Sequence, residues 1–235
     1  MSTADRKARL TTHLVQAILT LELAPGAELD EAALCERFAL SRTPVRDVFR
    51  DLEGLGYVRV KGQRGARVSD LSHQTLRDFF LSAPMIYAAI LRLAARNATE
   101  LQVSELRTAQ EAFRKALRDG SVAERTLANH RFHRITGDMA GNIYFAPSFE
   151  RLLVDHARIG MTFYRPKSAE MVQNLSQASD QHEAIIEAIA AGDEEAAARL
   201  SEDHWALSRN QMESFIMPAA LDLHLGTGTD ARGKP

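Results

Sequence analysis

The stretch Leu40-Ser41-Arg42-Thr43-Pro44-Val45-Arg46-Asp47 contains the signals that start a helix. Thr43 can cap a helix that begins there, and Pro44 fits the first turn, where no backbone N–H is needed. Gly54 and Gly56 mark the other end, because glycine is common just after a helix. The sequence therefore predicts a helix from about Thr43 to Leu55.

Two more helices are predicted before this one. Apolar residues recur at helical spacing over residues 6–22, and Pro25-Gly26 then ends that segment. Asp30 can cap a short helix over residues 30–38, after which Ala39-Leu40 provides a turn. Three helices in this order predict a helix-turn-helix unit, in which the second helix of the pair enters the DNA groove.

A wing is predicted directly after the helices. Strand-forming residues occupy positions 57–61 and 66–69, and the loop at 62–65 that joins them contains two glycines. Together with the three helices, this predicts a winged helix-turn-helix domain over residues 1–71.

The rest of the chain has a helical pattern up to about residue 217. Breaks in the pattern predict about six helices of roughly 15–25 residues each, which is typical of a helical bundle. We therefore expect a mainly α protein with an all-helical second domain over residues 72–217. The last ten residues, Gly226 to Pro235, are small and polar, and residues 218–235 are expected to form a disordered tail. The breaks lie near residues 97–99, 119–120, 141–142, 166 and 192–193.

A row of arginines begins one residue before the predicted helix 43–55 and continues along it. Arg42, Arg46 and Arg50 are four residues apart and therefore lie on one face. Arginine can bind guanine O6 and N7 with two hydrogen bonds, or phosphate. Ser41 and Thr43 add hydroxyl groups near the helix start, which itself favours phosphate. The charges alone leave an alternative, because nearby acidic residues could turn this row into a solvated, salt-bridged face. Those residues are Asp47, Asp51 and Glu53.

The composition limits the class of protein. The 235 residues have a formal net charge of −2, and residues 1–70 carry 11 Lys or Arg against 10 Asp or Glu. Any DNA-binding surface must therefore be a local patch. Cys35 is the only cysteine, so no intrachain disulfide can form, as is usual in a reducing compartment. No signal peptide is visible, and no segment approaches the roughly 18 apolar residues of a membrane span. We expect a cytoplasmic protein without a membrane partner.

Histidines in the helical region form a candidate metal site. Asn129 and His133 share a helix face, and His182 and His204 each fall on another predicted helix. Three imidazoles and one oxygen suit Zn²⁺ or Ni²⁺, and bundles build such sites from facing helices. The spacing leaves open that these are ordinary hydrogen-bonded histidines. His182-Glu183 is no zinc-protease motif, because Ile186 stands where the second histidine would be.

Several further strings accompany residues 40–47. They are Leu29-Asp30-Glu31, Leu34, residues 52–58 (Leu-Glu-Gly-Leu-Gly-Tyr-Val) and residues 64–68 (Arg-Gly-Ala-Arg-Val). In this order they resemble the GntR family of bacterial transcriptional regulators. The resemblance implies that operator DNA is contacted by the recognition helix and the wing tip, here Arg42, Thr43, Arg46, Arg64 and Gly65. Ala32 stands where the family often has arginine, so a contact made there in relatives is expected to be absent.

A second resemblance covers the helical region. Asn129-x-x-Phe132-His133, the run His182 to Asp193 and His204 are similar to the FCD ligand-binding domain of the FadR-like GntR subfamily. With the first resemblance it spans about residues 8–215. It implies a divalent metal on Asn129, His133, His182 and His204, with lower affinity than usual because Asn replaces the commoner Asp. The other histidines, which are His13, His73, His130 and His156, have no matching role and are expected to be structural or exposed.

The FCD resemblance also implies a small-molecule effector, commonly a carboxylate that completes the coordination of the metal. The segment 81–87 lacks the Arg and Glu expected there, which weakens the carboxylate inference. Arg158 and Tyr164, on a later helix, are candidate effector contacts, although an exposed Arg and a half-buried Tyr are the alternative. Trp205 is expected to belong to the core.

Three functions are compatible with these observations. The first is a ligand-responsive transcriptional regulator, more commonly a repressor in this family, that binds a pseudo-palindromic operator as a homodimer. The second is a metal-dependent hydrolase with Glu183 as general base. The third is an architectural DNA-binding dimer without an effector. We favour the first, because a hydrolase would leave the DNA-binding domain unexplained.

Overall fold

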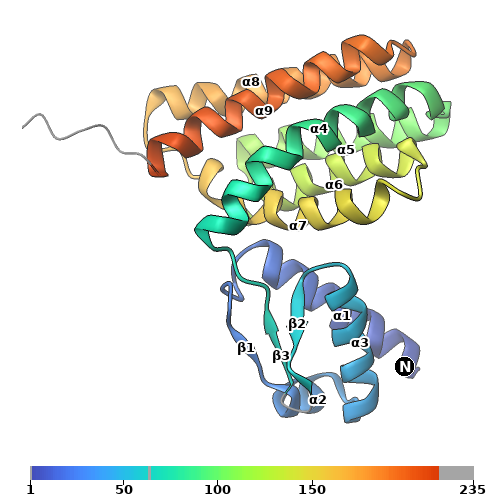
Figure 1. Cartoon of the computed structure of the whole chain (residues 1–235), viewed down its shortest axis with the longest axis vertical. Helices are drawn as coiled ribbons and strands as arrows, with labels where there is room; N and C mark the ends of the chain where they lie inside the picture. Colours follow the sequence, from blue (N-terminus) through green and yellow to red (C-terminus); the bar gives the residue numbers. More distant parts are fainter. Residues whose placement is uncertain (1, 63–64, 217–235) are drawn as a thin grey trace, which may run out of the picture.

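The computed structural model describes residues 2–62 and 65–216, and its elements form two groups, one above the other in Figure 1. The lower group, which we call the head, runs from the N-terminus to β3. It contains α1 (Thr3–Leu19), β1 (Glu28–Leu29), α2 (Glu31–Phe38), α3 (Arg42–Gly54), β2 (Val58–Val60) and β3 (Ala66–Val68).

The predicted wing is present with one additional strand. β3 pairs antiparallel with β2 on one side and with β1 on the other, in the strand order β1-β3-β2. The short strand β1 was not predicted, because two residues give no alternating pattern. It ties the segment before α2 to the wing.

The ends of the head helices follow local capping chemistry. Asp30 caps α2 by accepting hydrogen bonds from the backbone of Ala32 and Ala33, as predicted. The prediction for α3 was wrong by two residues, since Ser41 is the N-cap in place of Thr43. The helix α1 begins earlier than expected, at a capping box formed by Ser2 and Asp5, and it ends earlier because Leu21 adopts a left-handed conformation with φ 58°.

The upper group is a bundle of six helices, as the sequence predicted. They are α4 (His73–Asn97), α5 (Glu100–Asp119), α6 (Val122–Ala140), α7 (Ala146–Phe163), α8 (Ala169–Ala190) and α9 (Glu194–Ile216). Each predicted break falls between two of them. The predicted tail, 218–235, lies outside the described residues.

One helix of the bundle passes a simple test for a membrane span. By length and composition alone α4 could cross a membrane, with a mean hydropathy of 1.4, although no such segment was expected. Its apolar side chains Phe79, Tyr87 and Ile90 are buried instead in a cluster with residues of α6, α7 and α9. This packing identifies α4 as a core helix of the bundle.

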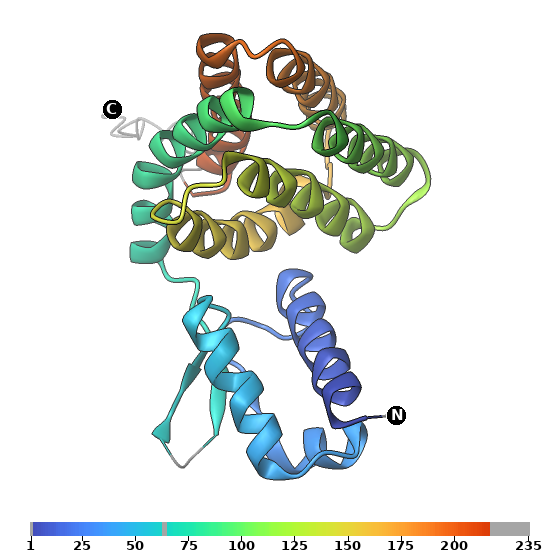
Figure 2. The same cartoon turned by 90° about the vertical axis from the view of Figure 1, so that its right-hand side faces the viewer.

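The helix α7 joins the two groups. Figure 2 shows α1 of the head rising towards the lower layer of the bundle, to which α7 belongs. Val154 and Ala157 of α7 are buried in the same apolar cluster as Leu10, Leu14 and Ile18 of α1. The opposite side of α7, with Phe149 and Leu153, packs into the bundle core. One helix therefore touches the interiors of both groups.

Candidate functional site

The first candidate site is the exposed face of α3. Four apolar side chains on its other face are buried in the head. This packing fixes the rotation of the helix about its axis, and therefore which residues face the solvent. The buried residues are Val45, Val48, Phe49 and Leu52; Ser41, Arg42, Thr43 and Arg50 are exposed, and Arg46 is half-buried. The structure thus brings the predicted recognition residues to one surface.

Glu31 of α2 organises two of these arginines. Its Oε2 accepts a hydrogen bond of 2.9 Å from Nε of Arg46, and its Oε1 lies 3.6 Å from Nε of Arg42. The Glu31 side chain is 13% exposed, so the carboxylate that binds Arg46 is shielded from much of the solvent. Because Glu31 occupies Nε of Arg46, the terminal nitrogens remain to donate the two parallel bonds that guanine accepts.

The salt-bridged alternative for this face is present only in part. Asp47 accepts from Nη1 of Arg50 at 3.2 Å and lies 3.6 Å from Nζ of Lys7. Glu53 instead accepts from the backbone N–H of Val60 at 2.8 Å and so ties α3 to the wing. The side chain of Arg42 is 74% exposed and that of Arg50 is 67% exposed. Most of the charged surface of α3 therefore remains accessible to DNA.

A groove of about 440 Å³ runs between α3 and the wing. Gly62 and Gly65 have φ values of 57° and 88°, a conformation that glycine adopts at little cost and that lets the wing turn here. Gln63 and Arg64 lie outside the described residues, and Arg64 is a predicted wing-tip contact. The groove is lined by Arg46, Phe49, Arg50, Val60, Gly62 and Gly65.

The second candidate site is a histidine cluster inside the bundle. His133 of α6, His182 of α8 and His204 of α9 each offer a ring nitrogen, and these three atoms lie within 4.8 Å of one another. All three residues are buried, His182 completely. Asn129 lies one turn before His133 and is 3% exposed. The structure therefore assembles the predicted histidines from three helices.

Several buried polar atoms of this cluster have no hydrogen-bond partner among the described residues. They are Oδ1 of Asn129, Nε2 of His133 and Nε2 of His182. A buried polar atom without a partner is costly, so such atoms usually mark a bound ion, ligand or water. Three imidazole nitrogens with an amide oxygen fit a borderline divalent ion such as Zn²⁺ or Ni²⁺. This donor set suits the metal that the sequence predicted.

Two glutamines that sequence reasoning missed orient the histidines. The amide nitrogen of Gln110 donates to the carbonyl oxygen of Ser179 at 3.0 Å, so its oxygen faces Nδ1 of His182, also at 3.0 Å. The oxygen of Gln181 lies 2.9 Å from Nδ1 of His204. Each oxygen can only accept, which places the ring proton on Nδ1 and leaves Nε2 as a lone-pair donor. Such outer partners commonly fix the orientation of metal-bound histidines.

The electrostatics keep the imidazoles neutral. Burial, with a smaller effect from the neighbouring histidines, holds the pKa of His133 and of His182 well below the usual 6.5. Burial lowers the pKa of His204 to about 4. A neutral imidazole is the form that binds a metal, so the cluster needs no deprotonation to do so at pH 7.

A fourth histidine, which was expected to be structural or exposed, also lies in this region. His156 of α7 is 8% exposed, and its ring centroid lies 4.7 Å from that of His133. Its Nδ1 lies 2.7 Å from the hydroxyl oxygen of Tyr87. Burial lowers the pKa of His156 to about 3 and raises that of Tyr87 well above 10, so both groups are neutral and either can donate in this hydrogen bond.

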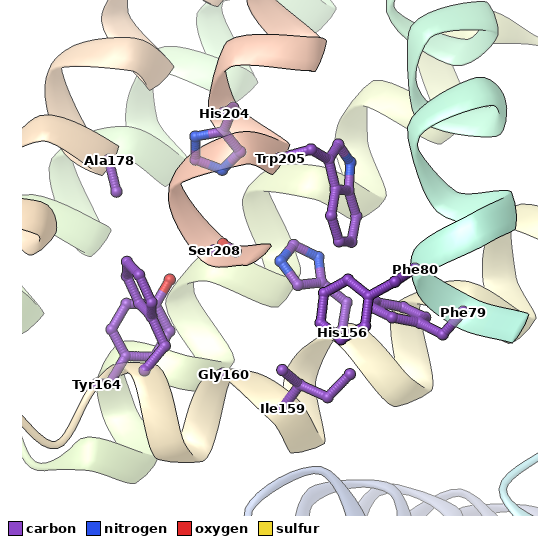
Figure 3. A pocket seen from close by; sticks show the side chains of 11 residues that line it. Phe79, Phe80, His156, Ile159, Gly160, Tyr164, Ala178, His204, Trp205 and Ser208 are labelled. Atoms are coloured by element: carbon purple, nitrogen blue, oxygen red, sulfur yellow. The ribbon is translucent and has the colours of Figure 1, made fainter. Parts of the chain in front are cut away.

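A small cavity lies next to the cluster, between α4, α7 and α9. Figure 3 shows His204 and Trp205 on α9, with His156, Ile159 and Tyr164 below them and Phe79 and Phe80 to one side. Its volume, about 10 Å³, admits little more than one water molecule. Tyr164, a predicted effector contact, lines this cavity. Trp205, expected to be core, is buried yet lines it too.

Arg158, the other predicted effector contact, is elsewhere. It is 1% exposed, and its Nη1 donates to the carbonyl oxygen of Ser69 at 2.6 Å, in the link between β3 and α4. Its Nη2 pairs with Asp155, which also lies 3.4 Å from Nη2 of Arg151. Arg151 donates in turn to the carbonyl oxygen of Gly56 at 3.0 Å. Arg158 therefore faces the head rather than the cavity, because it lies on the opposite side of α7 from His156.

Comparisons with known proteins agree with this architecture. Residues 6–68 match the gntR family of bacterial regulatory proteins, and residues 85–207 match the FCD domain. The transcriptional repressor NanR of Enterobacter sp. is 30% identical, over 82% of this chain and 79% of its own. A probable D-xylose utilization operon repressor of Paenarthrobacter nicotinovorans is 27% identical, over 87% and 90%. The E. coli McbR/YncC structure shares the fold, with a TM-score of 0.70 at 19% identity over 90% of this chain and 99% of its own.

Proposed function

We infer the function from the family to which the chain belongs: it is a member of the GntR family of bacterial regulatory proteins, with an FCD domain, and is therefore a transcriptional regulator and not an enzyme. We propose that it represses transcription in the bacterial cytoplasm by binding a pseudo-palindromic operator as a homodimer. The two relatives from Enterobacter sp. and Paenarthrobacter nicotinovorans are described as repressors, which supports repression over activation. We propose residues 1–71 as the DNA-binding domain and 72–217 as the regulatory domain.

One observation carries the DNA-binding part of the proposal. Arg42, Thr43 and Arg46 lie on the exposed face of α3, and Glu31 orients both arginines towards the same side. We propose that this face enters the major groove of the operator, with Ser41, Arg50, Arg64 and Gly65 as further contacts.

The regulatory part rests on the histidine cluster. We propose that Asn129, His133, His182 and His204 hold a divalent ion, with Gln110 and Gln181 orienting two of the imidazoles. A bound ion would supply a positive centre beside the cavity, where a small-molecule effector completes its coordination. Tyr164 remains a proposed effector contact, while we reassign Arg158 to the junction with the head.

We assign the dimer contact to the outer face of α4. Leu81 and Met85 lie one helical turn apart, with 64% and 75% of their surface exposed. A two-fold axis allows such an apolar patch to cover itself on a second copy. We propose that the two-fold axis runs from the bundle towards the heads, so that the two heads lie on the same side of the dimer, as two half-sites require.

The operator and the dimer can be tested together by selection from a random DNA library. We expect the full-length wild-type chain, loaded with Zn²⁺, to enrich inverted repeats. A Met85→Asp variant should be monomeric in light scattering and lose the enrichment of paired half-sites, because a charge opposes burial of the patch. Enrichment of single, unpaired sites by a wild-type monomer would contradict the proposal.

We propose that α7 transmits the state of the cavity to the head. His156 on one side of α7 contacts His133 of the cluster. On the other side, Arg151 donates to the carbonyl oxygen of Gly56 in the head and Arg158 to that of Ser69 in the link after β3, and Asp155 pairs with both arginines. A shift of α7 would therefore reach Gly56, which directly follows the last turn of α3. The connection is made of hydrogen bonds with defined partners, so it can be broken selectively.

Replacement of Arg151 by Ala should weaken this connection. We expect Zn²⁺ to slow hydrogen exchange in α3 and the wing of the wild-type chain, and to have a several-fold smaller effect in the variant. Arg107→Ala, which removes an exposed arginine paired with Glu187 away from the head, is the matched control. Equal protection of the head in wild type and Arg151→Ala would exclude this route.

A further inference from the structure

We propose that the effector has a flat, apolar ring as its body and a single anionic oxygen group as its head, so that a ring-bearing monocarboxylate represents its class. The inference rests on the proposed function, because it concerns the cavity beside the proposed metal. It excludes two other classes of effector, namely dicarboxylates and polyhydroxylated sugars or sugar acids.

The walls of the cavity favour the ring. Five of the described residues that line it are aromatic, namely Phe79, Phe80, Phe163, Tyr164 and Trp205. The ring centroids of Phe79 and Phe80 lie 5.2 and 6.4 Å from that of Trp205, both edge-to-face. An edge-to-face wall offers ring faces and edges to a further ring, which is how aromatic groups prefer to pack. Ile159 and Ala178 add aliphatic surface.

The charge of the site favours one anionic group. Three neutral imidazoles and a neutral amide would leave the full charge of a divalent ion uncompensated, so an anionic oxygen is the preferred additional ligand. Among the described lining residues there is no Lys or Arg. A second carboxylate on the effector would therefore be buried without a partner, which is strongly unfavourable.

The cavity wall has too few polar groups to form hydrogen bonds with all the hydroxyl groups of a sugar. Among the described residues Nε1 of Trp205 is buried without a partner and can donate one hydrogen bond, and the imidazole of His156 can add one more as donor or acceptor. Tyr164 and Ser208 add two hydroxyl groups. A polyhydroxylated body would lose more hydrogen bonds to water than this wall returns. A single carboxylate on the metal brings no such set of hydroxyl groups that the wall would have to satisfy.

The cavity must open before such a ligand can enter. Its volume is only about 10 Å³, and Phe80 and Trp205 separate it from an outer groove of about 260 Å³ that Pro84 and Arg209 also line. Pro84 has no N–H to donate to the carbonyl oxygen of Phe80, so α4 lacks one helical hydrogen bond at this point. Displacement of Phe80 and Trp205 is therefore the entry route that the structure offers.

Trp205 is the only tryptophan of the chain and so reports on this cavity directly. The experiment titrates the Zn²⁺-loaded full-length chain with benzoate, phenylacetate and cyclohexanecarboxylate, and separately with succinate, malate and gluconate, while tryptophan fluorescence is recorded. We expect a saturable change with at least one ring-bearing acid, at an affinity ten-fold or more above that for every acid of the second group. Equal or tighter binding of succinate, malate or gluconate, or no binding of any ring-bearing acid, would overturn the inference.

Two variants place the binding event in the cavity. Ala178→Leu fills the cavity and should abolish the response, whereas Ala169→Leu makes the same change at an exposed position of the same helix and should leave it intact. If Ala178→Leu does not fold, Ser208→Leu fills the cavity from its half-buried rim. A response that survives both filling variants would show that the acids bind elsewhere.

Metal content and operator binding are measured on the same samples. If the chain binds Zn²⁺ and its operator but prefers succinate or gluconate, only the inference about the effector class fails. If the chain binds no Zn²⁺, the proposed metal-dependent function fails and the inference falls with it.

Discussion

Operator affinity should fall by about 5- to 150-fold when Arg46 is replaced by Ala, because one bidentate arginine–guanine contact is worth about 1–3 kcal/mol. The Nε of Arg46 is held by Glu31, and Arg46 lines the groove between α3 and the wing. Arg42→Ala should have a similar or smaller effect, since Arg42 is 74% exposed and lies 3.6 Å from Glu31. Fluorescence anisotropy with the selected operator at fixed salt measures both.

The control for this prediction is Arg96→Ala. Arg96 is also an exposed arginine in an ion pair, with Glu194, but it lies in the bundle. Its loss should leave operator affinity unchanged within two-fold. Wild-type affinity in both Arg42→Ala and Arg46→Ala would show that α3 is not the recognition helix. A comparison of two salt concentrations separates base contacts from phosphate contacts, because only loss of a phosphate contact reduces the salt dependence.

Removal of the metal ligands should produce the second large effect. Saturating metal at about 1,000 times its Kd stabilises a protein by about 4 kcal/mol, which for a domain of this size corresponds to a rise in Tm of about 10 °C. We expect Zn²⁺ to raise the Tm of the wild-type chain by about this amount. The double variant His133→Ala and His182→Ala should show no such rise, because two of the three imidazoles are lost.

The exposed His73 provides the control for this measurement. His73→Ala removes a histidine at the start of α4, outside the cluster, and should retain the full effect of Zn²⁺. A Gln110→Ala variant should retain metal binding with about 10- to 100-fold lower affinity, because it removes the partner of His182 Nδ1. An equal Tm rise in the wild type and the double variant would mean that Zn²⁺ binds elsewhere.

Much of the fold could be predicted because its signals are local. Asp30 caps α2, and every break between the bundle helices coincides with a glycine, proline or capping residue near the predicted position. The prediction failed where the deciding feature is not local. The strand β1 exists because β3 lies beside it, and α1 ends early because Leu21 takes a left-handed conformation that leucine seldom adopts.

The candidate sites show the same division. His133, His182 and His204 could be found by their residue type and by resemblance, and the structure brings them together. Their partners Gln110 and Gln181 could not, because an exposed and a buried glutamine look alike in a sequence. The places of His156 and Arg158 could not be predicted for a related reason. They lie two residues apart on α7, and only the packing shows that one faces the cluster and the other the head.

Metal analysis of the purified, full-length chain shows whether the histidine cluster is a metal centre in a DNA-binding regulator. The chain is stripped with a chelator, reloaded with Zn²⁺, freed of excess ion and assayed for metal by mass spectrometry. We expect about one ion per wild-type chain and none in the double variant His133→Ala and His182→Ala. A folded wild-type chain that binds its operator but retains no ion would contradict this expectation.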